Sequence, residues 1–303
     1  GISFFTALLF AIHPVQVETV CWISASKIVL STFFYLSALI CYIQYMRNSK
    51  WQYLLASVVS SILAMGCKEQ SVIIVPCLLL FDWMLFKRNM RSLKVYIEKV
   101  YYLIPAIAIF IVTLVANKDT GEEIIGYTIV DRFIFLCYSV FKYLLISAIP
   151  FKLSYLYPFP FQVGEKIPMA LWIYPFVILF IGYVIYLNRR KPLLVFCTLF
   201  FILHLLPVLH VIPLPRYVVA ADRYLYIPYI AFAIGLSILS YHLYERQRKW
   251  ILYAGFLYCS YLCVYTAGYA PAWKNSDTLK EHFKEVLKKR ETNLSINFKH
   301  EKQ

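Results

Sequence analysis

Residues 169–191 read MALWIYPFVILFIGYVIYLNRRK, a run of twenty residues without a charge that stops at three consecutive cations. A membrane hydrocarbon core about 30 Å thick takes roughly 20 apolar helical residues to cross. The stretch therefore predicts a transmembrane helix that ends at a short basic loop.

Runs of the same character recur along most of the chain. They cover residues 28–46, 51–66, 71–86, 100–116, 192–212, 223–243 and 250–268, and residues 1–12 resemble the end of another. Of the 303 residues, 61% are hydrophobic and only 15% are charged, which is more apolar surface than a soluble domain of this size buries. The sequence predicts an all-α, polytopic integral membrane protein with about nine transmembrane helices.

The formal net charge of +14 comes from Lys and Arg that lie between the apolar runs. A nucleic-acid-binding protein gathers its cations on one folded face, so this distribution argues against a nucleic-acid partner. The cations form four basic loops: Arg47 and Lys50; Lys87, Arg88, Arg91, Lys94 and Lys99; Arg189, Arg190 and Lys191; Arg246, Arg248 and Lys249. Short loops rich in Lys and Arg stay in the cytoplasm, so these four predict the inner side.

The remaining loops define the outer side. Three of them are poorer in cations: residues 13–27, 67–70 and 117–128. An even number of crossings must separate the inner loops at 87–99 and 189–191. Residues 129–149 carry charges at helical spacing, so we assign them to a helix lying in the outer interface. Residues 150–168 then remain outside.

The ends and the cysteines complete the organisation. Residues 1–271 are predicted to form one membrane domain, and residues 272–303 an external polar helical tail with Lys and Glu at helical spacing. The chain begins inside an apolar run without an initiator Met, so we expect an N-terminally truncated fragment. The eight cysteines have no CxxC pair or metal-ligand spacing, so we interpret them as small apolar residues and expect no metal site.

Polar residues gather at the predicted outer face, where ionisable groups beside lipid mark functional sites by default. They form four clusters: His13-Pro14-Val15-Gln16-Val17-Glu18; Lys68-Glu69-Gln70; Tyr155-Leu156-Tyr157-Pro158; and Arg216-Tyr217 with Asp222-Arg223-Tyr224-Leu225-Tyr226. Each alone is also explained by an interfacial aromatic belt or an exposed ion pair. Together they suit a phosphate headgroup on a lipid tail, because cations neutralise the phosphate and apolar helix faces hold the tail.

These motifs resemble the membrane domain of transmembrane proteins with tetratricopeptide repeats, which include dolichyl-phosphate-mannose O-mannosyltransferases and bacterial homologues. The resemblance covers residues 1 to about 275. Its motifs are His13 to Glu18, Trp22, Ala25-Ser26-Lys27-Ile28, Lys68, Leu80-Phe81-Asp82-Trp83, Tyr157-Pro158 and Ala221 to Pro228. The Arg and Asp that flank the Lys in the commoner family version are absent here.

The resemblance implies a GT-C type glycosyltransferase. Such an enzyme passes a sugar, here a mannose-like one, from a polyprenyl-phosphate donor to a hydroxyl acceptor on protein or glycan at the outer membrane face. The lipid-linked donor is the expected ligand, with no certain cofactor. The resemblance also implies that the catalytic carboxylate precedes Gly1 and that tetratricopeptide repeats follow the tail. Without a targeting signal we favour the bacterial inner membrane, with the endoplasmic reticulum as the alternative.

Each site residue has an expected role. Four cations are expected to bind the donor phosphate: Lys27, Lys68, Arg216 and Arg223. Glu18 and Asp222 would support catalysis by orienting those cations or the acceptor. Four further side chains would line the site: His13, Tyr157, Tyr224 and Tyr226. On the inner side, Asp82 before Lys87 and Arg88 indicates an interfacial ion pair.

Two other functions stay open. A transporter is also a helical bundle with polar groups, but it usually places them near the bilayer midplane and shows repeated halves. A non-catalytic membrane assembly subunit is the third possibility.

The topology is directly testable. A cysteine introduced at Lys118 or Lys166 should react with a membrane-impermeant maleimide from outside, because both positions fall in predicted outer loops. The parent chain gives the background from the native cysteines. Modification only from the cytoplasmic side would reverse the predicted orientation of every helix.

Overall fold

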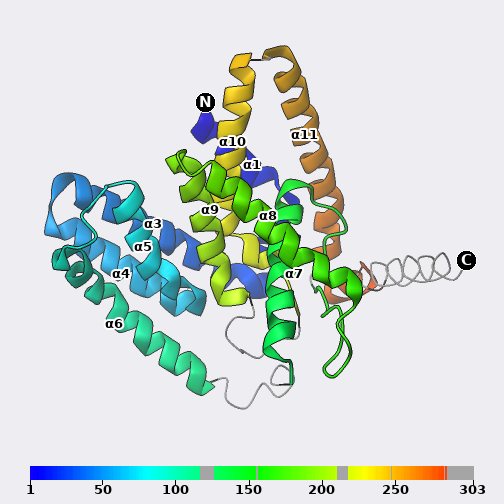
Figure 1. The fold of residues 1–303 in the computed structure, drawn as a ribbon, viewed down its shortest axis with the longest axis horizontal. Coiled ribbons are helices and arrows are strands. Elements are labelled where there is room, and N and C mark those ends of the chain that lie inside the picture. The colour runs from blue at the N-terminus through cyan, green and yellow to red at the C-terminus, as the bar shows by residue number, and fades with distance from the viewer. Residues whose placement is uncertain (117–125, 155, 210–217, 247, 283, 285–303) are drawn as a thin grey trace, which may run out of the picture.

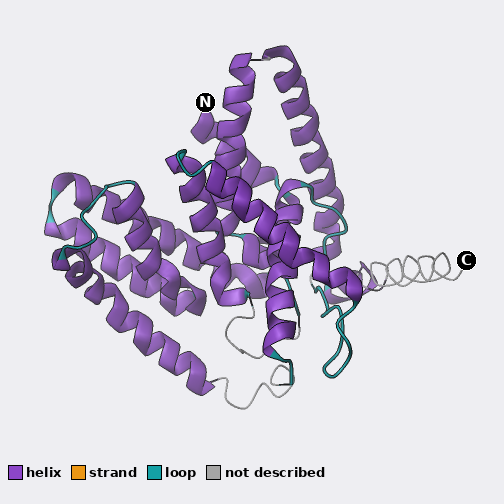
Figure 2. Cartoon of the chain, viewed as in Figure 1, coloured by secondary structure: helices purple, strands orange, loops and turns teal. Residues whose placement is uncertain are grey.

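The computed structural model describes residues 1–116, 126–154, 156–209, 218–246, 248–282 and 284. In these residues the chain is a bundle of helices, with α3 to α6 grouped on one side of the molecule (Figures 1 and 2). The sole β pairing within the described ranges is an isolated antiparallel bridge between Tyr157 and Ala220. The all-α class is therefore confirmed.

The α-helices follow the apolar runs of the sequence. They are α1 (Ile2–Ile12), α2 (Val17–Cys21), α3 (Ser26–Asn48), α4 (Trp51–Cys67), α5 (Ile74–Met84), α6 (Leu93–Ala116), α7 (Ile129–Ala148), α8 (Ile173–Leu187), α9 (Pro192–Leu205), α10 (Pro228–Arg246) and α11 (Arg248–Tyr269). Short 3-10 turns join several of them: η1 (Pro14–Gln16), η2 (Ile23–Ala25), η3 (Glu69–Ile73), η4 (Met169–Trp172), η5 (Leu206–Val208), η6 (Asp222–Leu225) and η7 (Ala270–Trp273).

Four helical segments of the described chain are long and apolar enough to cross a membrane: Ile23–Asn48, Leu93–Ala116, Met169–Leu187 and Arg248–Trp273. A fifth results if α1 and the segment Pro14–Cys21, which meet at a bend of 55°, form one broken span. Helix α8 has no buried residue within the chain, as expected of a helix that faces lipid. The helices support a membrane protein, whereas nine crossings and a GT-C type arrangement stay predictions.

Two predicted boundaries differ from the structure. The run at 71–86 opens with a 3-10 turn, and α5 has only 11 residues, about 16 Å of helix, which is too short for a hydrocarbon core of about 30 Å. Helix α6 begins at Leu93, so Lys94 and Lys99 lie on a helix and not in a basic loop. Lys99 is 3% exposed, because its ammonium group pairs with the buried carboxylate of Asp82.

The segment predicted as an interfacial helix is helix α7. Its first turn has a capping box in which Thr128 and Asp131 exchange hydrogen bonds, and this fixes where the helix begins. One face is buried, with Phe135 and Tyr143 almost fully inaccessible. The helix at 129–149 is thus confirmed, while its position in the membrane interface stays a prediction.

Small residues let α3 and α4 pack closely as a helical hairpin. Ala38, Ser57 and Ala64 are fully buried, and the Ser57 hydroxyl donates to the Ala38 carbonyl at 2.7 Å. Tyr102 of α6 donates to the same Ser57 hydroxyl at 2.8 Å. Helix packing in lipid depends on such close contacts and interhelical hydrogen bonds, because burial of apolar surface gives no driving force there.

A buried charge network ties α3, α5 and α6 together. Lys99 contacts Asp82 at 2.7 Å, and Arg88 contacts Glu98 at 2.6 Å and Asp82 at 3.3 Å. The Tyr42 hydroxyl donates to Asp82 at 2.5 Å. Two cations and two carboxylates balance in charge. The expected pair of Asp82 and Arg88 is confirmed, but the closest cation to Asp82 is Lys99.

Removing one member of this network should destabilise the fold. Asp82→Ala leaves Lys99 buried without its carboxylate, which costs about 3–5 kcal/mol in buried pairs. We expect the detergent-purified variant to lose monodispersity at a clearly lower temperature than the parent. Glu245→Ala is the control, since Glu245 lies in an exposed pair 4.0 Å from His242. Equal thermal loss in both variants would contradict a stabilising role for the network.

Candidate functional site

The segment His13 to Glu18 enters the interior because α1 stops at a proline. His13 has an extended backbone, and its Nδ1 accepts a hydrogen bond from the Val15 amide at 3.3 Å. Pro14 begins the following 3-10 turn, a position where its missing N–H has no partner to lose. The chain then bends, and Glu18 in α2 is carried to a position with no exposure to solvent.

A second segment, before α10, is held against Tyr157. The Val219 amide donates to the Tyr157 carbonyl at 2.9 Å, and the Tyr157 amide donates to the Ala220 carbonyl at 3.3 Å. The Ala221 amide donates to the Tyr143 hydroxyl of α7 at 3.3 Å. These bonds fix the backbone immediately before the 3-10 turn that carries Asp222 and Arg223.

Glu18 and Arg223 join the two segments across 205 residues of sequence. The Arg223 guanidinium donates to one Glu18 carboxylate oxygen at 2.6 Å, and the Arg223 backbone amide donates to the other at 2.8 Å. The Arg223 side chain is 18% exposed, with the rings of Trp22 and Tyr224 at 5.6 and 5.0 Å from its Cζ. Glu18 therefore orients a partly exposed guanidinium that stacks beside two aromatic rings.

Asp222 is buried beside this pair but bonds elsewhere. Its Oδ1 accepts from the Tyr157 hydroxyl at 2.8 Å, and its Oδ2 has no hydrogen-bond partner among the described residues. Burial raises the pKa of Asp222 well above its usual range, and the charge of Glu18 raises it further, against the opposing effect of Lys142 and Arg223. Burial therefore favours the protonated form of Asp222, in which Oδ2 can donate a hydrogen bond.

Further buried polar atoms make no hydrogen bond within the described residues. They are both amide atoms of Gln16 and the hydroxyls of Ser147, Ser154 and Tyr229. The His13 ring lies 4.3 Å from the Tyr229 ring. The Tyr269 hydroxyl lies close enough to Asp222 and Glu18 to interact electrostatically with both carboxyl groups. An unpaired buried polar atom costs roughly 1–3 kcal/mol, so this set can bind a polar ligand or ordered water.

Lys27 and Lys68 form a separate basic group around Glu69. Lys68 contacts the Glu69 carboxylate at 2.9 Å. Burial alone would raise the pKa of Glu69, but Lys68 and the nearby Lys27 lower it. No hydrogen bond or ion pair among the described residues joins this group to Glu18 or Arg223, so the roles of Lys27 and Lys68 at the donor phosphate stay predictions.

The outcomes for the other expected site residues differ. Tyr157 donates to Asp222, Tyr224 lies beside the Arg223 guanidinium, and the His13 ring lies beside the Tyr229 ring. Tyr226 was expected to line the site, but it packs into the core with its ring edge-on to Phe10 at 5.2 Å. The Tyr226 side chain, two positions after Tyr224, therefore lies against Phe10 of α1. Arg216 lies outside the described residues.

Sequence reasoning also missed two side chains. Lys142 has its Nζ 5.1 Å from the centre of the Tyr157 ring, although it was assigned to a charged face with Asp131 and Arg132. Tyr143 binds the backbone of Ala221. Both come from α7, and nothing local in that helix indicates that Lys142 lies over Tyr157 or that Tyr143 binds a residue 78 positions further along the chain.

Comparison with known proteins adds no relative: no protein-family model, no curated protein and no solved structure matches this chain. The site is therefore interpreted from its own residues.

The protonation of Asp222 predicts a pH-dependent stability. Since its pKa is raised above the ordinary 3.8, the folded protein keeps a proton that the unfolded chain releases, and stability falls as pH rises above about 4. Asp222→Asn removes this loss. Tryptophan fluorescence gives the melting temperatures of Asp222→Asn and of the parent. We expect the variant's melting temperature minus that of the parent to increase as pH rises above about 4. A difference that does not change with pH would show that Asp222 is ionised in the folded protein.

Proposed function

We propose that the chain is the membrane domain of a glycosyltransferase that uses a polyprenyl-phosphate-linked sugar. The donor sugar would be mannose-like, the acceptor a hydroxyl on protein or glycan, and the site would face the exterior of a bacterial inner membrane. The proposal joins the family resemblance of the sequence to the geometry at Glu18 and Arg223.

The observation that carries the proposal is the Glu18–Arg223 pair itself. The buried Glu18 carboxylate accepts one hydrogen bond from the Arg223 guanidinium and a second from the Arg223 backbone amide. These two bonds orient the guanidinium. Planar guanidinium groups bind phosphate oxygens through paired hydrogen bonds. A partly exposed, oriented Arg223 beside apolar helices suits a phosphate that is attached to a lipid.

The same geometry divides the chemical roles. In an inverting transfer, a base removes the proton of the acceptor hydroxyl as its oxygen attacks the anomeric carbon, and the bond from that carbon to the phosphate oxygen breaks. Arg223, with Lys27 and Lys68 further out, would stabilise the phosphate that departs with the electron pair. Both Glu18 oxygens accept hydrogen bonds from Arg223, and one Asp222 oxygen accepts from Tyr157. Both carboxyls thus suit the role of orienting groups, and the proposal assigns the role of base to neither.

A transporter is the second candidate, and one observation favours it. The polar residues lie where helices are interrupted, at the 55° bend after α1 and at the 3-10 turn before α10. Transporters form substrate sites at such discontinuous helices. Sugar transfer and solute uptake are separate measurements, so the two functions are distinguishable on the same purified protein. A non-catalytic assembly role would show neither.

Replacement of Arg223 tests the proposal. Arg223→Lys keeps the charge but loses the planar fork, and a charge-assisted hydrogen bond contributes roughly 1.5–3 kcal/mol. We measure polyprenyl-phosphate-sugar turnover by the full-length protein, normalised to monodisperse material. The donor concentration that gives half-maximal turnover should rise about tenfold. Arg223→Ala should be worse.

The matched control is Arg246→Lys at the exposed end of α10, which should keep the donor dependence of the parent. If Arg223→Ala lowers only the folded yield and leaves donor affinity unchanged, Arg223 serves the fold and does not bind the donor.

A further inference from the structure

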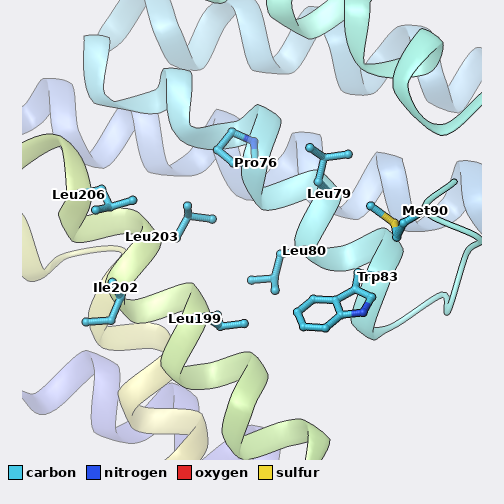
Figure 3. Close-up of a pocket in the computed structure, with 9 residues that line it drawn as sticks. All are labelled: Pro76, Leu79, Leu80, Trp83, Met90, Leu199, Ile202, Leu203 and Leu206. Atoms are coloured by element: carbon cyan, nitrogen blue, oxygen red, sulfur yellow. The ribbon is translucent and has the colours of Figure 1, made fainter. Parts of the chain in front are cut away.

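An apolar pocket of about 430 Å³ lies between α5 and α9 (Figure 3). It shares no lining residue with the Glu18–Arg223 site. Its lining is entirely apolar and includes Pro76, Leu80 and Trp83 of α5, Met90 of the following loop, and Leu199 and Leu203 of α9. The volume is within the range of about 300–1,000 Å³ that ligand pockets have.

The pocket is elongated along the two helices. Pro76 lies near Leu206 at one end and Trp83 lies near Leu199 at the other, so α5 and α9 run in opposite directions (Figure 3). The two helices also contact through Phe81 and Phe196, whose ring centres are 5.3 Å apart. From Pro76 to Trp83 the helix rises about 10 Å. An apolar space of this length fits part of a hydrocarbon chain.

The Trp83 end of the pocket continues into a basic loop. Lys87, Arg91 and Lys94 are exposed, and no acidic residue lies between positions 83 and 97. Arg88 is already neutralised by Glu98 and Asp82, so Lys87 and Arg91 carry the net positive charge of the loop, and Lys94 adds to it from the first turn of α6. Half-exposed Trp83 is a residue type that prefers the level of the lipid headgroups.

The backbone holds one of these cations in a conformation that usually selects glycine. Lys87 has φ of 49°, in the left-handed region that often ends a helix. The Leu85 and Phe86 amides both donate to the Phe81 carbonyl, and the Arg88 amide donates to the Asp82 carbonyl. The chain thus turns sharply at the mouth of the pocket with a lysine where glycine is the favoured residue.

We infer that the pocket between α5 and α9 binds an acyl chain of an anionic phospholipid, whose phosphate is held by Lys87 and Arg91. An apolar pocket alone would accept any lipid, but the unneutralised cations at its mouth select an anionic headgroup. The site is separate from the proposed transferase site, and it gives the protein a specific lipid requirement on the face that carries its basic loops.

Lipid titration of the purified full chain tests the inference. Native mass spectrometry would compare phosphatidylglycerol with phosphatidylcholine of the same acyl chains. Each cation near a lipid surface changes affinity about fivefold, so Lys87→Gln with Arg91→Gln should weaken phosphatidylglycerol binding about thirtyfold. The control is Arg189→Gln with Arg190→Gln, which removes two exposed cations from another basic loop and should leave the affinity unchanged.

A second pair of variants tests the acyl-chain site. Leu203→Trp fills the pocket and should weaken phosphatidylglycerol binding, whereas Leu194→Trp, at an exposed position of α9 outside the pocket, should not. Equal affinity for the two lipids, or equal loss in both cation variants, would overturn the inference. So would a change of oligomeric state without a change of lipid affinity in Leu203→Trp, since the pocket would then be a contact between two copies. No outcome depends on transferase activity.

Discussion

The salt bridge between Glu18 and Arg223 is the constraint on which this end of the bundle depends. It connects the bend after α1 to the turn before α10, and it satisfies both oxygens of a carboxylate that has no access to solvent. A buried carboxylate without its cation would be strongly unfavourable. The two helices are therefore held in one relative position, and with them the backbone that places Asp222 against Tyr157.

Two buried charge clusters in the described part of the chain differ in how completely their polar groups are hydrogen-bonded. Around Asp82 and Lys99, charges balance and each described group has a partner, which is typical of a cluster that fixes helix packing. Around Asp222, a carboxyl oxygen and several hydroxyl and amide groups have no partner in the described chain. Unpaired buried polar groups are unfavourable unless something else binds them. This difference, more than the residue types, separates a structural cluster from a candidate site.

The sequence predicted the helices well because each apolar run is a local feature. It also selected Glu18, Asp222 and Arg223 as site residues, since charged side chains beside lipid are rare. It did not predict which of them pair: Asp222 was expected to orient Arg223, but that role falls to Glu18. It also did not predict that Lys99 lies on a helix and pairs with the buried carboxylate of Asp82. Pairing depends on how distant helices pack, which hydrophobic periodicity does not specify.

The protonation state of Asp222 changes the net charge around the Glu18–Arg223 pair. Were both carboxylates ionised, Glu18 and Asp222 would together neutralise Arg223 and Lys142. Burial favours the protonated form of Asp222, and with Asp222 protonated and Glu18 ionised the four groups carry one negative and two positive charges. An excess cation in a poorly solvated site attracts an anion more strongly than it would in water. The neutral carboxyl can then donate a hydrogen bond to that anion where a carboxylate would repel it, so the burial of Asp222 favours a phosphate ligand at Arg223.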